Sequence, residues 1–220
     1  MTSFDDKSFD PADFFSRARA HLRQGWPEEA FDPSMRPQNG DHRLNEPLPG
    51  ETVLLQAPAR PAAVLAAIVV HDDGASLLLT QRAGSLRDHS GQIAFPGGKI
   101  EPGESPLDAA LREAEEEIGL ARERIEILGC LDPYQTGTGF RVFPLVGVTR
   151  EPLSLSINNA EVEDVFETPL SFLMNAANHQ RHFLEWQGRR RQFYAMPYEN
   201  RYIWGATAGM IRNLYERLYL

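Results

Sequence analysis

The sequence has few of the features that mark secreted, disulfide-bonded or membrane-spanning proteins. It contains one cysteine among 220 residues, Cys130, which excludes an internal disulfide and a cysteine-rich metal site. We expect this thiol to be buried and inert. The first 15 residues have neither a basic start nor an apolar core, so they do not indicate a signal peptide. The longest apolar run, residues 62–70, is too short to span a bilayer. These absences favour a cytoplasmic protein.

Positive charge is also in short supply. Lys and Arg number 22 against 31 Asp and Glu, which gives a formal net charge of -9. A general basic surface for nucleic acid or for acidic membrane lipids is therefore excluded. An anionic ligand must be bound by a local basic cluster or through a bound cation.

Proline divides the chain into two parts. Eight of the 16 prolines fall within the first 61 residues. Asp10 and Pro11 predict the start of a helix, whose apolar positions follow helical spacing: Phe14, Phe15, Ala18 and Leu22. Between Trp26 and Pro61 the chain has no sustained periodicity, which is typical of a loop. We expect residues 1–60 to be an N-terminal extension, a helix and a proline-rich arm, that packs on the domain formed by residues 61–220 or on the partner subunit of a homodimer.

Strand and helix patterns alternate from residue 62 onward. Apolar runs at 62–71 and 76–82 predict a buried strand pair, with further strands at 124–131 and 140–150 and a hairpin that turns near Gly188. Helices are expected at 106–118, near 170–177 and at 206–218. Strands interleaved with helices predict an α/β layered domain with a mixed sheet.

The helix at 106–118 has clear end signals. Ser105 suits the N-cap with Asp108 completing a capping box, and Gly119 suits the left-handed position after the last turn. At about 100° per residue, one apolar stripe is expected to face the sheet; it comprises Leu107, Ala110, Leu111, Ala114 and Ile118.

The same helix carries four carboxylates within five positions, Glu113 and Glu115–Glu117. Like charges at this spacing repel and weaken a helix. Glu113, Glu116 and Glu117 fall on one flank, at i, i+3 and i+4, whereas Glu115 points away. An oxygen-rich, thiol-free cluster is what Mg²⁺ or Mn²⁺ prefers. The alternative is a solvated acidic face.

The residues before the cluster complete a longer pattern. It resembles the Nudix box at every fixed position: Gly98, Glu104, Arg112, Glu113, Ala114, Glu116, Glu117, Gly119 and Leu120. The resemblance implies a Nudix-type α/β/α sandwich with a mixed β-sheet and metal-dependent hydrolysis of a nucleoside diphosphate linked to another moiety. It also implies a divalent-ion site made by Glu113, Glu116, Glu117 and the Gly98 carbonyl.

Two further roles are carried over from the resemblance. Arg112 would orient the glutamates, with Glu104 as its partner. The general base stays open between Glu116 and Glu161, because many Nudix enzymes bring a carboxylate from a later loop to the metal site. Glu163 alternates with Glu161 on the same extended stretch, so either side chain could face the site.

The substrate is indicated by residues 77–98, just before the box. This segment resembles the second signature of the coenzyme A diphosphatase branch, in Leu79–Arg82, Leu86–Gln92 and Ala94–Gly98. The branch would cleave coenzyme A or its derivatives to 3′,5′-ADP and 4′-phosphopantetheine, or acyl-phosphopantetheine. Coenzyme A carries a diphosphate and a 3′-phosphate, for which cationic partners are available: Arg82, Arg87, His89 and Lys99.

Two other functions are compatible with the same residues. One is a Nudix hydrolase of another diphosphate, such as ADP-ribose or an oxidised nucleotide. The other is a non-catalytic ligand sensor on the same fold. The complete glutamate set with Arg112 favours an enzyme, because a pure binder need not keep a water-activating geometry.

Overall fold

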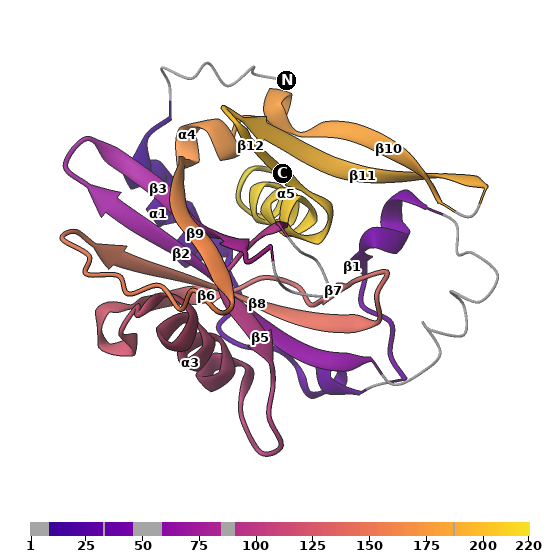
Figure 1. Ribbon diagram of the computed structural model, residues 1–220, viewed down its shortest axis with the longest axis horizontal. Helices are drawn as coiled ribbons and strands as arrows, with labels where there is room; N and C mark the ends of the chain where they lie inside the picture. The colour runs from indigo at the N-terminus through magenta and orange to yellow at the C-terminus, as the bar shows by residue number, and fades with distance from the viewer. Residues whose placement is uncertain (1–8, 33, 46–58, 85–90, 187) are drawn as a thin grey trace.

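A large mixed sheet forms the centre of the molecule (Figure 1). The computed structural model describes residues 9–32, 34–45, 59–84, 91–186 and 188–220. The sheet is ordered β1-β7-β8-β2-β3-β4, with β5 paired to β2, β6 to β8 and β9 to β3. Its strands are β1 Asn39–Gly40, β2 Arg60–His71, β3 Gly74–Arg82, β4 Ile93–Ala94, β5 Gly97–Lys99, β6 Glu126–Cys130, β7 Tyr134–Gln135, β8 Phe140–Arg150 and β9 Val162–Pro169. The sheet is mixed because β2 pairs parallel with β8 and antiparallel with β3.

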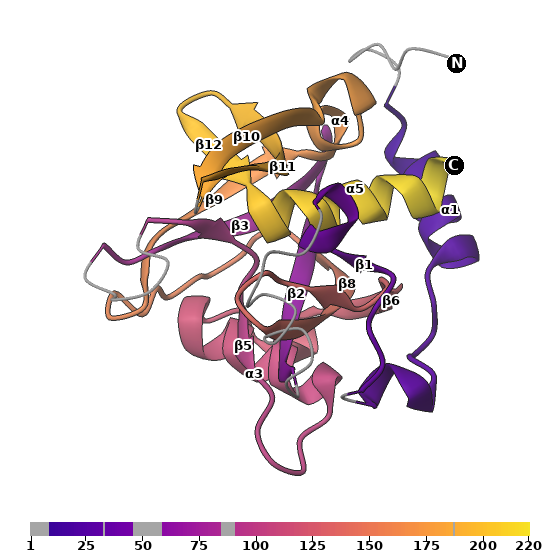
Figure 2. The same ribbon diagram turned by 90° about the vertical axis from the view of Figure 1, so that its right-hand side faces the viewer.

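Helices cover both faces of this sheet. Helix α3, Pro106–Ile118, lies on one face, and α5, Gly205–Tyr219, lies on the other (Figures 1 and 2). A second, three-stranded sheet packs on the far side of α5, with strands β10 Gln180–Trp186, β11 Arg189–Tyr198 and β12 Arg201–Trp204. The α/β/α sandwich with a mixed sheet that the sequence predicted is confirmed.

Strand β2 explains why its sequence is an unbroken apolar run. Successive side chains of a strand point to opposite faces. Ala66 and Ile68 belong to the core beneath α5, whereas Leu65, Ala67 and Val69 belong to the core beneath α3. Because β2 is buried on both faces, it shows no alternation of apolar and polar residues.

The described part of the extension packs on its own chain. Helix α1, Pro11–His21, is capped by Asp10, whose carboxylate accepts the Ala12 N–H at 2.8 Å. Its apolar face buries Phe14 and Ala18 against α5 and β6. Between α1 and β2 lie two 3₁₀ turns, Glu28–Phe31 and Asp41–Leu44, on either side of β1. Elements of two to four residues leave no periodic signal, so the sequence did not predict them.

Most other predicted elements are confirmed. The helix expected near 170–177 is the single turn α4, Leu170–Leu173, followed by a 3₁₀ turn at Ala176–Asn178. Strands β9 and β12 were not predicted, and neither were the short strands β4, β5 and β7. Cys130 is buried as expected, and burial raises the pKa of its thiol to about 11, which keeps it un-ionised. None of the described helices has the length and hydropathy needed to cross a membrane.

An imidazole joins three strands at one edge of the large sheet. His71 ends β2, and its Nδ1 lies 2.8 Å from a Glu151 carboxylate oxygen while Nε2 lies 2.6 Å from one of Glu167 in β9. Glu151 directly follows β8. The hydrogen bond to Glu151, followed by the one to Glu167, raises the pKa of His71 above its ordinary value of 6.5.

This bridge makes stability depend on pH. Because the folded-state pKa of His71 is raised, its contribution is fully present below the unfolded pKa and is lost as pH rises through the folded pKa. We therefore expect the difference in Tm between wild type and His71→Gln to be larger at about pH 6 than at about pH 9. Circular dichroism melts at both pH values test this. An equal difference at the two pH values would show that His71 contributes only as a neutral group.

Candidate functional site

Helix α3 begins and ends where the sequence predicts. The Ser105 hydroxyl accepts the Asp108 N–H at 3.1 Å. At the other end Gly119 has φ 69°, and the N–H of Leu120 donates to the Ala114 carbonyl at 3.3 Å. The buried face differs from the predicted stripe, because Leu107 is 38% exposed and Ala109 is fully buried. Leu107 lies in the first turn, beyond the part of the helix that the sheet covers.

Two consecutive glycines bring β5 close to both β2 and α3. A Cβ on Gly97, which has φ 154°, would lie 2.4 Å from the Ala63 carbonyl oxygen and 2.6 Å from the Val64 Cα. A Cβ on Gly98 would lie 2.4 Å from the carboxylate of Glu113. Only glycine permits these approaches. The Gly97 N–H also donates to Glu117 Oε2 at 3.1 Å, so β5 contacts the cluster directly.

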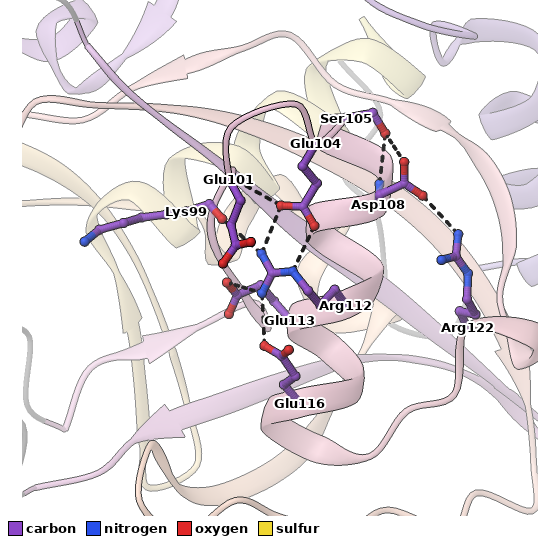
Figure 3. Close-up of polar contacts among 9 residues, drawn as sticks. All are labelled: Lys99, Glu101, Glu104, Ser105, Asp108, Arg112, Glu113, Glu116 and Arg122. Carbon is purple, nitrogen blue, oxygen red and sulfur yellow. Dashed lines mark hydrogen bonds and ion pairs between the residues drawn. The ribbon is translucent and has the colours of Figure 1, made fainter.

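Arg112 lies among the carboxylates and binds three of them (Figure 3). Its Nε and Nη2 donate to the two Glu104 carboxylate oxygens at 2.8 and 3.0 Å, a bidentate pair. Its Nη1 donates to Glu113 Oε1 and to Glu116 Oε2, each at 3.0 Å. Nη2 also donates to the Lys99 carbonyl at 3.2 Å. One guanidinium therefore fixes two glutamates of α3 relative to the preceding loop.

Burial distinguishes the three clustered glutamates. Glu117 is only 3% exposed, whereas Glu116 is exposed. The alternative of a solvated acidic face is therefore wrong for Glu117, whose carboxylate accepts the Gly97 N–H of β5. Burial, together with the charges of Glu113 and Glu161, raises the pKa of Glu117 to about 7. Burial likewise raises the pKa of Glu113, whereas the hydrogen bond from Arg112 lowers that of Glu104.

These residues fit a divalent cation. The donors are carboxylate oxygens without thiols, as hard cations require. Burial and mutual repulsion both disfavour the charged forms of Glu113 and Glu117, and a bound cation would relieve that repulsion. Gly98 leaves no side chain between β5 and the Glu113 carboxylate. Glu113, Glu116 and Glu117 are therefore able to hold such an ion, with the adjacent Gly98 carbonyl as a further oxygen.

A later loop brings a fourth carboxylate toward the cluster. Backbone hydrogen bonds join Glu161 to Asn158 and Asn158 to Glu117, so the loop lies against the end of α3, and the charge of Glu161 raises the pKa of both Glu113 and Glu117. No contact recorded among the described residues joins Glu163 to the cluster. Glu161 is held by Asn158, whose side-chain amide donates to Glu161 Oε1 at 3.2 Å.

Asn158 also ties this loop to the end of α3. Its N–H donates to the Glu117 carbonyl at 2.9 Å, and its own carbonyl accepts the Glu161 N–H at 3.0 Å. Its Oδ1 accepts the Ala160 N–H at 3.2 Å, which closes an Asx turn. The sequence analysis missed Asn158. The dipeptide Asn158-Asn159 before Ala160 was the available turn signal.

The predicted substrate-binding residues are placed unequally. Arg82 ends β3, and its charge lowers the pKa of Glu117, so it lies beside the cluster. Its Nε is buried and hydrogen-bonds to none of the described residues. Lys99 is exposed, and its amine extends away from Arg112 and the glutamates (Figure 3). Arg87 and His89 lie outside the described residues.

Comparison with known proteins identifies a family and relatives that match most of the chain. The family described as NUDIX domain matches residues 59–187. A Yersinia enterocolitica protein named uncharacterized Nudix hydrolase NudL is 38% identical over 177 residues, covering 80% of this chain and 89% of that protein. A Klebsiella pneumoniae protein of the same name is 38% identical over 181 residues, covering 82% and 87%. A solved Ap4A hydrolase from C. elegans matches 52% of this chain and 82% of its own at 23% identity and a TM-score of 0.45, which adds nothing to these matches.

Substituting each glycine of β5 separates stability from cation binding. Gly97→Ala brings a methyl group against the backbone of β2, so we expect the free energy of unfolding to fall by roughly 1–3 kcal/mol, which lowers Tm by roughly 2–12 °C. Gly98→Ala meets only the flexible end of Glu113, so Tm should change little. Displacing that carboxylate should instead weaken Mn²⁺ binding, by about tenfold or more, in a calorimetric titration.

Gly103→Ala is the control for this pair, because a Cβ there meets no atom within 4 Å. Its φ of 84° adds backbone strain without contact to the cluster. Mn²⁺ affinity should therefore be unchanged. Equal Mn²⁺ affinity in Gly98→Ala and wild type would show that Glu113 does not hold the ion.

Proposed function

Because the chain belongs to the Nudix hydrolase family, and so hydrolyses a nucleoside diphosphate derivative, we propose that its substrate is coenzyme A or an acyl derivative. The products would be 3′,5′-ADP and 4′-phosphopantetheine or acyl-phosphopantetheine. The supporting observation is the segment 77–98, which resembles the coenzyme A diphosphatase signature. It leads through β3 and β4 into Gly97 and Gly98, and its Arg82 lies beside Glu117.

Nudix hydrolases generally use divalent metal ions, and we propose Mg²⁺ or Mn²⁺ for this one. Glu113, Glu116, Glu117 and the Gly98 carbonyl would hold it. When bound, such an ion neutralises diphosphate charge and acidifies water. The contribution of the protein is to keep the carboxylates converged. Arg112 does this from one side through Glu104, and the Gly97 N–H does it from the other.

We propose Glu161 as the general base and keep Glu116 as the alternative. Glu161 is exposed, comes from a loop outside α3, and is oriented by the Asn158 amide. A base must face the attacking water at hydrogen-bond distance. Glu116 is already bound to Arg112 at 3.0 Å, which reduces its freedom to accept a proton.

We propose that cationic side chains bind the phosphates of the substrate. The guanidinium of Arg82 has a buried Nε with no described partner, next to the carboxylates where a diphosphate would lie. Guanidinium groups bind phosphate oxygens in a planar fork. Arg87, His89 and Lys99 complete the proposed set. The division into residues 1–60 and 61–220, a homodimer and a cytoplasmic location stay predictions.

Substrate preference tests the proposal. The enzyme with Mg²⁺ or Mn²⁺ should convert coenzyme A to 3′,5′-ADP and 4′-phosphopantetheine, detected by mass spectrometry. Dephospho-coenzyme A lacks the 3′-phosphate, so its kcat/KM should be about ten- to a hundredfold lower if one charge-assisted contact is lost. If Arg82 makes that contact, the difference in kcat/KM between coenzyme A and dephospho-coenzyme A should be much smaller in Arg82→Ala than in wild type.

Glu117→Gln should abolish most turnover of either substrate, by about a hundredfold or more, without lowering Tm. Gln removes charge from a buried group whose ionisation is already disfavoured, so the fold should keep its stability.

Much faster cleavage of ADP-ribose or of an oxidised nucleotide than of coenzyme A would contradict only the assignment of coenzyme A as the substrate. Binding of these compounds without any cleavage would instead indicate a ligand sensor.

The neighbouring asparagines provide a matched pair for the proposed base. Asn158→Ala removes the amide that orients Glu161, so kcat should fall about tenfold while KM changes little. Asn159→Ala alters an exposed neighbour and should leave both constants unchanged. Rates measured across pH in both variants check this. Equal kcat values in Asn158→Ala and wild type would mean that Glu161 is not positioned by Asn158.

A further inference from the structure

A polar cavity lies between the N-terminal arm (residues 38–44) and α5. Helix α5 covers the face of the large sheet opposite α3 (Figure 2). It has two adjoining parts, of about 480 and about 190 Å³, which share Asn39, Arg43 and Glu216 as lining residues. The larger part reaches the C-terminal turns of α5, and the smaller part reaches β7, β10 and β11. We call the two parts together the arm cavity.

The arm cavity carries an excess of positive charge. Two carboxylates line it, Asp132 and Glu216, against four guanidinium groups, those of Arg43, Arg181, Arg212 and Arg217. An excess of two positive charges is unusual in a chain whose formal net charge is -9. Clustered like charges repel unless an opposite charge lies among them.

The two carboxylates are already bound to other groups. Asp132 accepts hydrogen bonds from Arg23 at 3.1 Å, from Asn39 at 3.2 Å and from Asn213 at 3.3 Å, and it also pairs with Arg217. Glu216 accepts from Arg212 Nε at 2.9 Å and from Arg43 Nη1 at 3.3 Å. Neither carboxylate is left to neutralise Arg181.

Arg181 has no carboxylate partner among the described residues. Its guanidinium carbon lies 5.9 Å from the ring centroid of Tyr194, and that of Arg212 lies 5.9 Å from the same ring. Two cations therefore share one aromatic ring, an arrangement in which cation–π attraction is weak. Both arginines line the smaller part of the cavity, where an anion would stabilise them.

We propose that the arm cavity binds a phosphorylated small molecule, with its phosphate held by Arg43, Arg181 and Arg212. Guanidinium forks match phosphate oxygens. A phosphate monoester carries about 1.5 to 2 negative charges near neutral pH, which matches the excess of two positive charges. The site is separate from the carboxylates of α3 and does not depend on the proposed coenzyme A activity.

Calorimetric titration of the full-length protein with inorganic phosphate and with AMP, in EDTA, tests the proposal. EDTA removes divalent ions, so phosphate cannot bind through them at the α3 carboxylates. Wild type and Glu113→Gln should bind with equal Kd. Arg181→Ala should weaken binding about tenfold or more, the effect of one charge-assisted contact. Arg181 is exposed and makes no ion pair within the described residues, so its removal should leave Tm unchanged.

Arg190→Ala is the matched control, since Arg190 lies on the same hairpin and stacks on Phe183 outside the cavity. Its Kd should equal that of wild type. Tighter binding of AMP than of phosphate would assign the site to a nucleotide, and the reverse would assign it to free phosphate. The proposal is overturned if neither ligand saturates below about 10 mM. It is also overturned if Arg181→Ala binds as wild type does, or if Glu113→Gln loses binding.

Discussion

The site depends on the close approach of β5 to its neighbours on both sides. The backbone of Gly97 lies against that of β2, and the backbone of Gly98 lies against the carboxylate of Glu113. A side chain at Gly97 would push β5 away from β2, and one at Gly98 would displace the Glu113 carboxylate. Because β5 is held there, the Gly97 N–H reaches Glu117, and that carboxylate is covered by protein instead of water.

Packing of α3 onto the sheet provides the other half of this arrangement. The buried face of the helix is made largely of alanines, Ala109, Ala110 and Ala114, which oppose Ala63 and Ala67 of β2 in the same core. Small side chains allow the helix to lie close to the strand. At that distance one turn places Glu113 and Glu117 over β5, so the packing of the core and the placement of these two carboxylates beside β5 have the same origin.

The sequence predicted those parts of the structure that depend on local chemistry. Helix α3 has the predicted limits because Ser105 and Gly119 satisfy its ends within a few residues. Its pairing of Arg112 with Glu104 followed from the resemblance to a known motif. The burial of Glu117 was missed because it arises from the approach of β5, which helical spacing cannot reveal. Leu107 was misplaced for a similar reason, since a periodic stripe does not show where the sheet stops covering it.

Strand β9 was missed because its sequence does not alternate. Val165 and Phe166 are adjacent apolar residues, which breaks the period of two that identifies a strand. The pairing of β9 with β3 also shifts register between Gln81 and Arg82. The same shift lies beside the loop that carries Glu161. Irregular pairing and an irregular loop thus occur where a carboxylate must turn toward α3, and sequence periodicity is least informative at such positions.

Charge is distributed so that the two faces of the large sheet suit different ligands. The α3 face concentrates carboxylates, so a diphosphate can approach only if a cation and Arg82 offset the repulsion. The α5 face concentrates arginines in the arm cavity, where an anion needs no metal. The walls of the cavity come from residues 38–44, from β10 and β11 and from α5. None of these elements carries a carboxylate of the glutamate cluster on α3. Strand β2, which is buried on both faces, lies between the two sites. The two ligands would therefore bind without sharing a contact residue.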